Sequence, residues 1–329
     1  MKARLTSPEA LGEDTLLDSR LRPSSLSEFI GQAKIKELLS VFLTAAKERG
    51  EPVDHVLLSG PPGLGKTTLA GIIAREQGAE LRSTSGPAVE RQADMAGLLT
   101  SLKARDVLFI DEIHRLPKPV EEFLYPAMED FRVDIIIGEG PGARSIRLSL
   151  EPYTLIGATT RQGLLSEPLR ARFGISFRLD YYPPEEIEQV LRRSATILGI
   201  EATDEGLREI ARRSRGTPRV ANRLLKRVRD FAQVKADGVV DLEIARYALS
   251  AMEVDSRGLD EMDKRMLKVI IERFRGGPVG LKNLSVALGE DPGTIEEVYE
   301  PFLIREGLLM RTSRGRVATP LAYEHLGYV

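Results

Sequence analysis

Phosphate chemistry is indicated by the run Gly60-Pro-Pro-Gly-Leu-Gly-Lys-Thr-Thr68, which follows an apolar stretch and precedes a helical pattern. That context is typical of a phosphate-binding loop. Gly63 and Gly65 allow backbone N–H groups to close around phosphates, and Lys66 offers a cation to the β and γ phosphates. Thr68 adds a hydroxyl contact where the helix begins. A purely structural glycine turn would need neither the lysine nor the hydroxyl, so the run predicts ATP binding.

Hydrolysis is indicated by a second run, Val107-Leu-Phe-Ile-Asp-Glu-Ile-His114, in which four apolar residues end in two acids. Asp111 is the predicted outer ligand of Mg²⁺, and Thr67 offers its hydroxyl to the same ion. Glu112 is the predicted base that orients and deprotonates the attacking water. His114 is an alternative base, but Glu112 already fills that role and a structural histidine is the preferred interpretation.

Three further polar residues complete the predicted catalytic set. Thr160 ends the next apolar stretch and is a candidate for sensing the γ-phosphate. The segment Leu169-Arg-Ala-Arg-Phe173 presents two arginines, one of which would reach the γ-phosphate bound by a neighbouring subunit. We assign this role to Arg172, whereas a surface ion pair fits Arg170 better. Arg219 begins a later helix and is a candidate sensor that ties domain rotation to nucleotide state.

A parallel sheet with crossover helices must position these side chains. Short apolar runs alternate with longer periodic segments from about Val53 to Tyr182, which is typical of an α/β fold. Ligands bind at the carboxyl ends of such strands. The expected strands are His55 to Leu58, Val107 to Ile110 and Tyr153 to Gly157. We place a large P-loop ATPase domain at residues 1–182.

The remainder of the chain predicts two smaller domains. Pro183-Pro184 ends the α/β pattern, and a small all-helical domain is expected at 183–253, with helices at Glu185 to Leu198, Asp204 to Arg213, Pro218 to Val234 and Leu242 to Met252. After a polar linker, a winged-helix domain is expected at 256–329. Its helices are Leu259 to Phe274, Leu281 to Leu288 and Thr294 to Arg305. A β-hairpin over Gly307 to Pro320 would form the wing.

Composition excludes several classes of protein. No apolar run approaches the roughly 18 residues that a membrane helix requires, and the N-terminal residues lack the apolar centre of a secretory signal, so we expect a cytoplasmic protein. The chain has no cysteine, which argues against a transition-metal site. The net charge of −2 restricts DNA contact to local basic stretches, such as Arg208 to Arg229 or Arg305 to Arg316. A solvated helix face or loop is the simpler explanation of each stretch.

Together these motifs resemble those of AAA+ ATPases, and longer segments resemble the RuvB family of Holliday-junction branch-migration motors. These segments are Glu121-Glu-Phe-Leu-Tyr-Pro-Ala-Met-Glu-Asp-Phe131, Arg213-Ser-Arg-Gly-Thr-Pro-Arg219, Arg227-Val-Arg-Asp-Phe-Ala-Gln233 and Arg311-Thr-Ser-Arg-Gly-Arg-Val-Ala-Thr319. They are distributed over nearly the whole chain from Leu21. The resemblance implies a homohexamer that encircles duplex DNA and works in recombination, DNA repair and the SOS response.

The resemblance also assigns nucleotide contacts that the residues alone would not have indicated. It implies that Leu21, Arg22 and Tyr182 hold the adenine, although sequence alone would place them on the surface. It further implies that Glu129-Asp130-Phe131 lies close to nucleotide. By itself, Phe131 has the appearance of an ordinary core aromatic.

An inserted hairpin at about 134–150 is predicted from Asp134-Ile-Ile-Ile-Gly-Glu-Gly-Pro-Gly142 and Ser145-Ile-Arg-Leu-Ser-Leu150. Three successive isoleucines on such a projection would be half exposed, which favours a docking surface. The resemblance implies that this hairpin engages RuvA, the junction-binding partner, and that the RuvC resolvase joins the same assembly. Simple extension of the sheet remains the alternative.

The wing carries Arg311, Arg314 and Arg316 without an aromatic partner among them, which suits contact with backbone phosphates rather than bases. Arg311 and Arg316 match the family motif and are the predicted DNA-binding residues. They lie an odd number of positions apart, so they need not share a face of the hairpin. Each neutralised phosphate would contribute a slope of about −0.9 to the dependence of log affinity on log salt.

Three alternatives remain open at this point. A clamp loader would share the ATPase core, but it would lack the winged head and often carries zinc-binding cysteines. A winged-helix regulator that uses ATP only as a switch is opposed by Glu112 and the arginine finger. A protein unfoldase would have no role for the arginine-rich wing.

Overall fold

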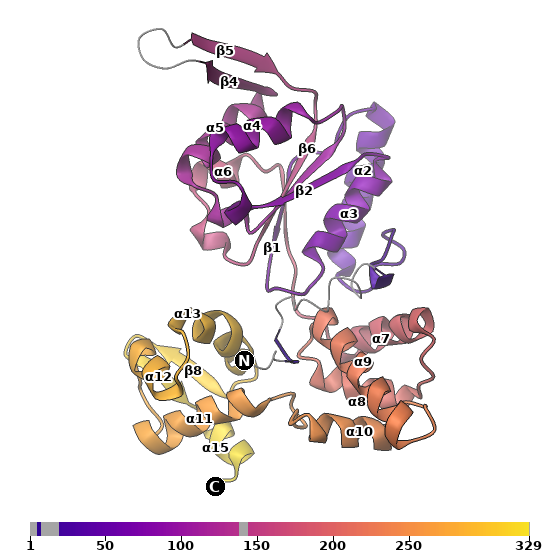
Figure 1. Cartoon of the computed structure of the whole chain (residues 1–329), viewed down its shortest axis with the longest axis vertical. Helices are drawn as coiled ribbons and strands as arrows, with labels where there is room; N and C mark the ends of the chain where they lie inside the picture. Colours follow the sequence, from indigo (N-terminus) through magenta and orange to yellow (C-terminus); the bar gives the residue numbers. More distant parts are fainter. Residues whose placement is uncertain (1–4, 8–19, 138–143, 329) are drawn as a thin grey trace. The chain divides into compact units, whose positions relative to one another are not determined.

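The computed structural model describes residues 5–7, 20–137 and 144–328. The chain divides into two compact units, one formed by Leu21–Tyr181 and the other by Met1–Arg20 together with Tyr182–Val329 (Figure 1). The first unit holds the predicted phosphate loop and acid pair. The second holds the predicted helical and winged-helix domains.

The core of the first unit is a five-stranded sheet in the order β2-β3-β6-β1-β7. All of its pairings are parallel. The three central strands are β1 (Val56–Ser59), β3 (Val107–Asp111) and β6 (Thr154–Thr159), which are almost completely buried. Nearly continuous apolar sequences of this kind are typical of parallel strands covered on both faces. The three strands expected from the sequence are thereby confirmed to within two residues.

The sequence did not predict two strands of this sheet, β2 (Leu81–Ser85) and β7 (Ile175–Arg178). They form the two edges of the sheet. Their sequences, LRSTS and ISFR, include polar residues because one side of an edge strand is partly exposed. The apolar run that identified the central strands is therefore missing.

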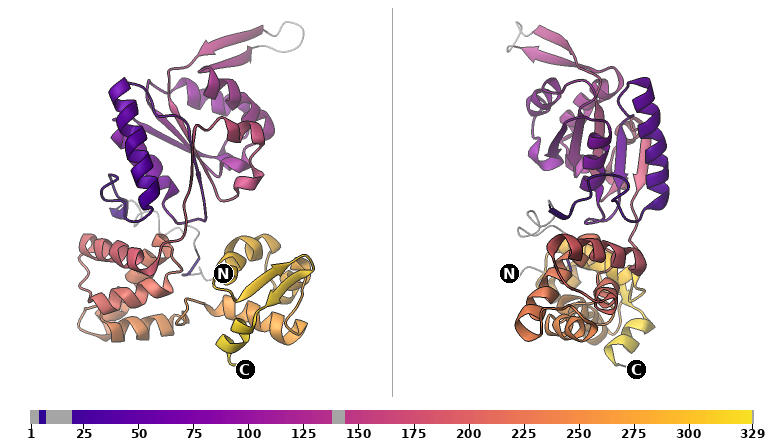
Figure 2. Two further views of the ribbon diagram at one scale, coloured as in Figure 1. Left: turned by 180° about the vertical axis from the view of Figure 1, so that it is seen from behind. Right: turned by 90° about the vertical axis from the view of Figure 1, so that its right-hand side faces the viewer.

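Helices cover both faces of the sheet (Figures 1 and 2). The helices α2 (Ala33–Arg49) and α3 (Lys66–Glu76) lie on one face, and α4 (Gln92–Thr100), α5 (Lys118–Glu129) and the short α6 (Glu167–Ala171) lie on the other. Leu108, Ile110 and Leu155 pack into one buried cluster with residues of α4 and α5. Because side chains alternate along a strand, the intervening residues of β3 and β6 face the opposite layer.

The inserted hairpin is formed by β4 (Arg132–Ile137) and β5 (Arg144–Ser149), which pair antiparallel. It extends from the rest of the first unit (Figure 1). The predicted hairpin is thus confirmed, with its first strand beginning two residues earlier than expected. The glycine-rich turn predicted between the strands lies outside the described residues.

The second unit begins with four helices, α7 (Pro184–Leu198), α8 (Asp204–Arg213), α9 (Pro218–Lys235) and α10 (Leu242–Ala251). Each of them agrees with its predicted range to within one residue at either end. Pro184 and Pro218 occupy the first helical position, where the missing N–H has no intrahelical role. Gly199 ends α7 with a φ of 64°, a left-handed conformation that favours glycine.

The winged head follows with α11 (Glu261–Phe274), α12 (Leu281–Leu288), α13 (Pro292–Thr294) and α14 (Glu300–Arg305). A π-helical segment, Ile295–Tyr299, joins α13 to α14, so the expected single helix from Thr294 begins earlier and is wound differently. The wing is a two-stranded hairpin of β8 (Leu309–Thr312) and β9 (Gly315–Ala318). A final helix, α15 (Pro320–Leu326), was not expected from the sequence.

A buried arginine links the helical and winged parts of the second unit. Arg215 lies in the turn before α9 with a φ of 57° and is 4% exposed. Its guanidinium pairs with Asp263 of α11 and lies 4.2 Å from the centroid of the Phe302 ring. Arg305 donates a hydrogen bond of 2.8 Å to the Arg215 carbonyl. Loss of Arg215 or Asp263 would break this buried ion pair, which is costly.

Candidate nucleotide and DNA sites

The phosphate loop connects β1 to α3 through backbone conformations that favour glycine. Gly60, Gly63 and Gly65 have φ values of 136°, 78° and 103°. A Cβ atom on Gly60 would approach the Leu179 carbonyl oxygen to 2.4 Å, so a larger residue would displace the backbone there. The loop thereby brings main-chain N–H groups together at the end of β1.

The helix that follows the loop is suited to bind an anion. Its N-cap is Gly65, which provides no side-chain hydrogen bond, so the first N–H groups of α3 remain available to a ligand. The Lys66 ammonium donates hydrogen bonds to the carbonyl oxygens of Gly60 and Pro61 at 2.7 and 2.9 Å. Thr67 and Thr68 lie in the first turn of α3 and are partly exposed. A triphosphate can replace the carbonyl contacts of Lys66.

The strand register brings the predicted acids and the predicted sensor to the same edge of the sheet. Because β6 lies between β1 and β3, Thr159 is paired with Ser59 at the start of the loop. On the other side of β6, Ile110 is paired with Gly157, so Asp111 and Glu112 follow at the same level. Thr160 therefore lies between the phosphate loop and the acid pair.

Glu112 is held by groups at the ends of these strands. Thr160 Oγ1 donates to Glu112 Oε2 at 3.2 Å, and the Glu112 N–H donates to Asp111 Oδ1 at 3.0 Å. Glu112 has a φ of 49°, a conformation that is unusual for a residue with a side chain and frequent at functional sites. Burial, followed by the nearby charge of Asp111, raises the pKa of the Glu112 carboxyl above its ordinary value. A raised pKa makes the carboxylate a better proton acceptor.

The His114 side chain contacts the Glu112 carboxylate. Its Nδ1 atom lies 3.3 Å from Glu112 Oε2 and 2.9 Å from Thr159 Oγ1, and the Arg161 N–H donates to the same hydroxyl at 3.0 Å. The imidazole therefore connects the end of β6 with the predicted base. These contacts support the structural interpretation of His114.

Arg172, the predicted finger, is the C-cap of α6. Its guanidinium pairs with Glu129 Oε1 at 3.1 Å, donates to the Pro168 carbonyl at 2.7 Å and lies 4.3 Å from the centroid of the Tyr125 ring. The sequence favoured a surface ion pair at Arg170 rather than at Arg172, whereas the structure shows that Arg172 forms one. Tyr125 had no predicted role.

The segment Glu129-Asp130-Phe131 ends α5 and begins the inserted hairpin. Glu129 contacts Arg172, and Asp130 pairs with Arg132 at 2.9 Å. Phe131 has a φ of 49°, and its ring packs with those of His55 and Tyr153 at centroid distances of 6.2 and 5.8 Å. Phe131 is thus a partly buried aromatic, as its sequence context alone indicated.

The predicted adenine contacts are divided between the two units. Leu21 is 5% exposed and Arg22 is exposed in the first unit. In the second unit, the Tyr182 N–H donates to the Gly216 carbonyl at 2.9 Å, which brings Tyr182 next to the turn before α9. Arg219 lies in the first turn of that helix. Within the second unit, Tyr182 and the predicted sensor arginine therefore belong to one local structure.

The two predicted DNA-binding arginines share one face of the wing. Arg311 and Arg316 are directly paired across β8 and β9, so the sequence spacing was misleading about their faces. Arg316 is 7% exposed, and its guanidinium binds Glu300 Oε1 at 2.7 Å and Glu296 Oε1 at 3.1 Å. Arg311 is exposed and pairs with Glu296 at 2.7 Å. The acids, which come from the π segment and α14, had no predicted role.

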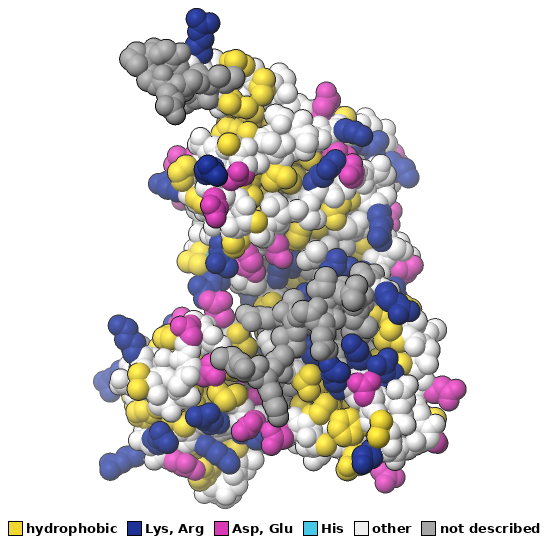
Figure 3. Space-filling model, viewed as in Figure 1, with side chains coloured by type: hydrophobic (Ala, Val, Ile, Leu, Met, Phe, Trp, Pro, Cys, Tyr) yellow, Lys and Arg dark blue, Asp and Glu magenta, His cyan; other side chains and the backbone are white. Residues whose placement is uncertain are grey.

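The face of the molecule shown in Figure 3 carries Lys and Arg interspersed with Asp and Glu, in keeping with the net charge of −2.

On the inserted hairpin, Ile135 packs against the core of the first unit, whereas the Ile146 side chain opposite it is 44% exposed. Of the three isoleucines expected to be half exposed, Ile135 is partly buried. The side chains of the other two lie outside the described residues. Ile146 is thus an exposed apolar side chain of the hairpin.

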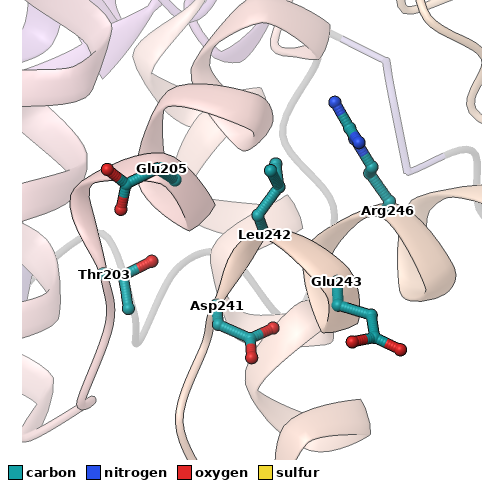
Figure 4. A pocket seen from close by; sticks show the side chains of 6 residues that line it. All are labelled: Thr203, Glu205, Asp241, Leu242, Glu243 and Arg246. Carbon is teal, nitrogen blue, oxygen red and sulfur yellow. The ribbon is translucent and has the colours of Figure 1, made fainter.

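A shallow hollow of about 460 Å³ lies where the helices α8 and α10 begin (Figure 4). Its lining includes three acids, Glu205, Asp241 and Glu243, and one arginine, Arg246. Asp241 accepts a hydrogen bond from the Ile244 N–H, so the first turn of α10 is already capped. Its acidic lining makes the hollow unsuitable for phosphate, and none of the predicted nucleotide contacts lines it.

The oxygen donors at the phosphate loop fit magnesium. Mg²⁺ prefers oxygen ligands, keeps several waters, and is usually held by one or two carboxylates together with substrate phosphates. The Thr67 hydroxyl and the Asp111 carboxylate match that requirement. No group of three His, Cys, Asp or Glu residues that could hold a metal by itself occurs among the described residues.

No helix among residues 20–137 and 144–328 is long and apolar enough to cross a membrane. The combination of a phosphate loop after β1, an acid pair at the end of β3 and a helical domain that follows the sheet defines a P-loop ATPase of the AAA+ class. The comparisons with known proteins make this assignment more specific.

Three families match consecutive parts of the chain. Residues 21–179 match the Holliday junction DNA helicase RuvB P-loop domain, 182–255 the RuvB AAA lid domain, and 256–327 the RuvB C-terminal winged helix domain. A Holliday junction branch migration complex subunit RuvB of Salinibacter ruber is 60% identical over 317 residues, which are 96% of this chain and 92% of that protein.

Solved structures agree with these matches. The RuvB Holliday junction branch migration motor of Thermotoga maritima is 52% identical, with a TM-score of 0.85, over 94% of this chain and 99% of that one. A single-residue mutant of the same protein has a TM-score of 0.86, with 52% identity over 93% and 98% of the two chains. The chain belongs to the RuvB family, and it is an AAA+ ATPase with a winged-helix domain.

Proposed function

We propose that this chain is the ATP-driven motor of Holliday-junction branch migration, and that it moves duplex DNA as a homohexameric ring. The observation that carries the proposal is the succession of P-loop, lid and winged-helix matches over residues 21–327. A clamp loader shares the first part of this arrangement but not the winged head. We place the domain boundaries at 1–182, 183–253 and 256–329 and expect the protein in the cytoplasm.

In the proposed reaction, the loop glycines and the first turn of α3 bind the phosphates, and Lys66 releases its carbonyl contacts to bind the β and γ phosphates. Bound Mg²⁺, held by Thr67 and Asp111, would neutralise phosphate charge. Glu112 orients the attacking water and accepts its proton. Arg172 of a neighbouring subunit stabilises the charge that develops at the γ-phosphate.

Thr160 links recognition of ATP to activation of the base. Its hydroxyl donates to Glu112 Oε2 at 3.2 Å, and the same hydroxyl is the predicted γ-phosphate contact. Since one hydroxyl hydrogen cannot serve both acceptors, ATP binding would release Glu112 for the water. The remaining assignments are adenine contact by Leu21, Arg22 and Tyr182, nucleotide proximity of Glu129, Asp130 and Phe131, and nucleotide sensing by Arg219.

The test is ATP-dependent migration of a synthetic four-way junction by the purified chain, with and without RuvA. The Lys66→Ala variant is the control for nucleotide binding, and Glu112→Gln is the control for hydrolysis. Migration that requires ATP, Lys66, Glu112 and RuvA supports the proposal. DNA-stimulated ATP hydrolysis without movement of the junction would refute branch migration and favour another DNA-remodelling ATPase.

We further propose that the hairpin of β4 and β5 binds RuvA and that RuvC acts on the same junction complex. Ile146 is the residue to change because it is exposed and apolar. An Ile146→Asp variant should lose RuvA binding while its DNA-stimulated ATP hydrolysis stays close to wild type. The matched control is Val286→Asp, because Val286 of α12 is also an apolar side chain and is 84% exposed. If both variants bind RuvA as tightly as the wild type does, the hairpin is excluded as the RuvA-binding surface.

A further inference from the structure

The helix that presents Arg172 cannot hold its position alone. The helix α6 comprises only five residues, Glu167–Ala171, with Arg172 as its C-cap. Isolated helices of fewer than about 12 residues are marginal in water, because few hydrogen bonds offset the cost of nucleation. The direction of the Arg172 side chain must therefore be determined by contacts from other elements.

One face of α5 supplies these contacts. Glu121, Tyr125 and Glu129 are spaced four residues apart on α5, so they lie on the same side of that helix. Glu121 and Tyr125 contact the beginning of α6, and Tyr125 and Glu129 contact its end. Tyr125 is the residue of this face that contacts both ends of the short helix.

At the beginning of α6, the N-cap Ser166 accepts a hydrogen bond from the Leu169 N–H at 3.2 Å. The Ser166 hydroxyl donates to Glu121 Oε1, and Tyr125 donates to the same oxygen at 2.6 Å. The oxygens of Tyr125 and Ser166 are 3.3 Å apart. Burial, followed by the hydrogen bond to Glu121, raises the pKa of the Tyr125 hydroxyl, so the hydroxyl keeps its proton at neutral pH.

At the end of α6, the Tyr125 ring lies under the Arg172 guanidinium, with 4.3 Å between the Cζ atom and the ring centroid. A ring face attracts a planar cation without supplying a competing negative charge. Glu129, by contrast, carries a carboxylate that competes with phosphate for the same guanidinium. The ring can therefore support Arg172 both before and during its approach to a γ-phosphate.

We propose that Tyr125 is a positioning residue for ATP hydrolysis: its hydroxyl anchors the beginning of α6 and its ring supports the guanidinium of Arg172. This inference rests on the proposed role of Arg172 as an arginine finger for the neighbouring subunit. Tyr125 itself does not touch the nucleotide. Its contribution is the direction and the restricted motion of the arginine that does.

Steady-state ATP hydrolysis with duplex DNA, using the full-length protein, tests the proposal. Tyr125→Leu should lower kcat about tenfold, the size expected for loss of a cation–π contact and a hydrogen bond. The KM for ATP should change by less than about twofold, because the finger acts in the transition state. Tyr125→Phe keeps the ring, so it should lose only about threefold in kcat. Tyr247→Leu, at a tyrosine of α10 that is 52% exposed, is the matched control and should hydrolyse ATP like the wild type.

A double-mutant cycle separates positioning from a general defect in folding. Arg172→Ala should lower kcat about 1000-fold. Tyr125→Leu should then cause no further loss in the Arg172→Ala background, because there is no finger left to position. A further tenfold loss there, a kcat of Tyr125→Leu within twofold of wild type, or an increase in KM alone would each overturn the proposal. An unchanged kcat of Arg172→Ala would refute the finger itself, and with it this inference.

Mixed rings provide a readout that a local structural defect would not produce. Tyr125→Leu subunits keep an intact phosphate loop, whereas Lys66→Ala subunits keep an intact finger. If Tyr125 positions a finger that acts on the neighbour, mixing the two variants should raise ATP hydrolysis several-fold above the sum of the separate activities. No gain on mixing, under conditions in which Arg172→Ala and Lys66→Ala subunits do complement each other, would overturn the proposal.

Discussion

The phosphate loop and the wing both carry cations predicted to contact phosphate, yet the structure holds these cations in different ways. Lys66 donates to two neutral carbonyl oxygens of its own loop, at 2.7 and 2.9 Å. Arg316 instead binds the carboxylate of Glu300, which is 1% exposed, and that of Glu296. Carbonyl contacts are readily exchanged for a phosphate, whereas separating a buried ion pair is costly. For the same predicted role, we therefore expect a ligand-binding cation in the phosphate loop and a structural cation in the wing.

Removal of Lys66, the cation of the phosphate loop, should have the largest effect, and that effect is on ATP hydrolysis. We expect Lys66→Ala to lower ATP hydrolysis about 1000-fold, because charge stabilisation at the transferred phosphate is lost. Its unfolding midpoint in urea should stay close to that of the wild type. A large loss of stability in this variant would contradict the comparison, since it would make Lys66 a structural cation as well. Steady-state ATP hydrolysis and urea denaturation are the two measurements required.

Removal of the buried wing cation should reduce stability instead. Arg316→Met removes the near partner of the buried Glu300 and leaves that carboxylate with the longer contact to Arg311 at 3.9 Å. The loss should cost about 3 kcal/mol of the free energy of unfolding of the winged head. Urea denaturation measures this loss of stability, and hydrogen exchange of the β8 and β9 amides is the local probe. Arg311→Met is the matched control, because Arg311 is the cross-strand partner of Arg316 and its side chain is 56% exposed. Equal stability of the two variants would remove the distinction between ligand-binding and structural cations.

His55 lies just before β1, the strand that leads to the phosphate loop, and its hydrogen bond to β6 requires a neutral imidazole. His55 Nδ1 accepts a hydrogen bond from the Leu155 N–H at 2.9 Å, so protonation at Nδ1 would break that contact. Burial lowers the pKa of His55 below its ordinary value of 6.5. The unfolded chain therefore binds a proton that the folded one does not. Stability from this group is present above pH 6.5 and lost below it, with a slope of at most about 1.4 kcal/mol per pH unit.

Urea denaturation at pH 7.5, 6.5 and 5.5 checks this dependence, with hydrogen exchange of the Leu155 amide as a local probe. A His55→Gln variant cannot titrate and should lose the difference attributable to this residue. If wild type and His55→Gln lose stability in parallel below pH 6.5, the imidazole is not the responsible group.

Removal of the exposed wing cation should have the smallest effect on stability and a defined effect on DNA binding. Arg311→Met should change the free energy of unfolding by less than about 1 kcal/mol, as is usual for an exposed ion pair. If Arg311 contacts one phosphate, the slope of log affinity against log salt should become shallower by about 0.9. Fluorescence anisotropy with a labelled duplex at several salt concentrations measures this slope. An unchanged slope would mean that Arg311 makes no phosphate contact.

Much of the fold follows from patterns along the chain. The central strands are continuous apolar runs, and the helices α8 and α12 occupy the predicted ranges without change. The edge strands β2 and β7 lack such runs, because one side of each strand is partly exposed. The π-helical segment Ile295–Tyr299 also escaped prediction, since its sequence has the same apolar periodicity as an ordinary helix.

By itself, the sequence determined the phosphate loop, the acid pair and the order of the domains, because each depends on residues that are close together along the chain. The tertiary structure decided which cations are held by acids and which by carbonyl groups. It paired Arg311 with Arg316, buried Arg316 against Glu300, and brought Tyr125 of α5 to Arg172 at the end of α6. Charge pairing and ring stacking act over a few ångströms, so their partners are chosen by folding rather than by spacing in the chain.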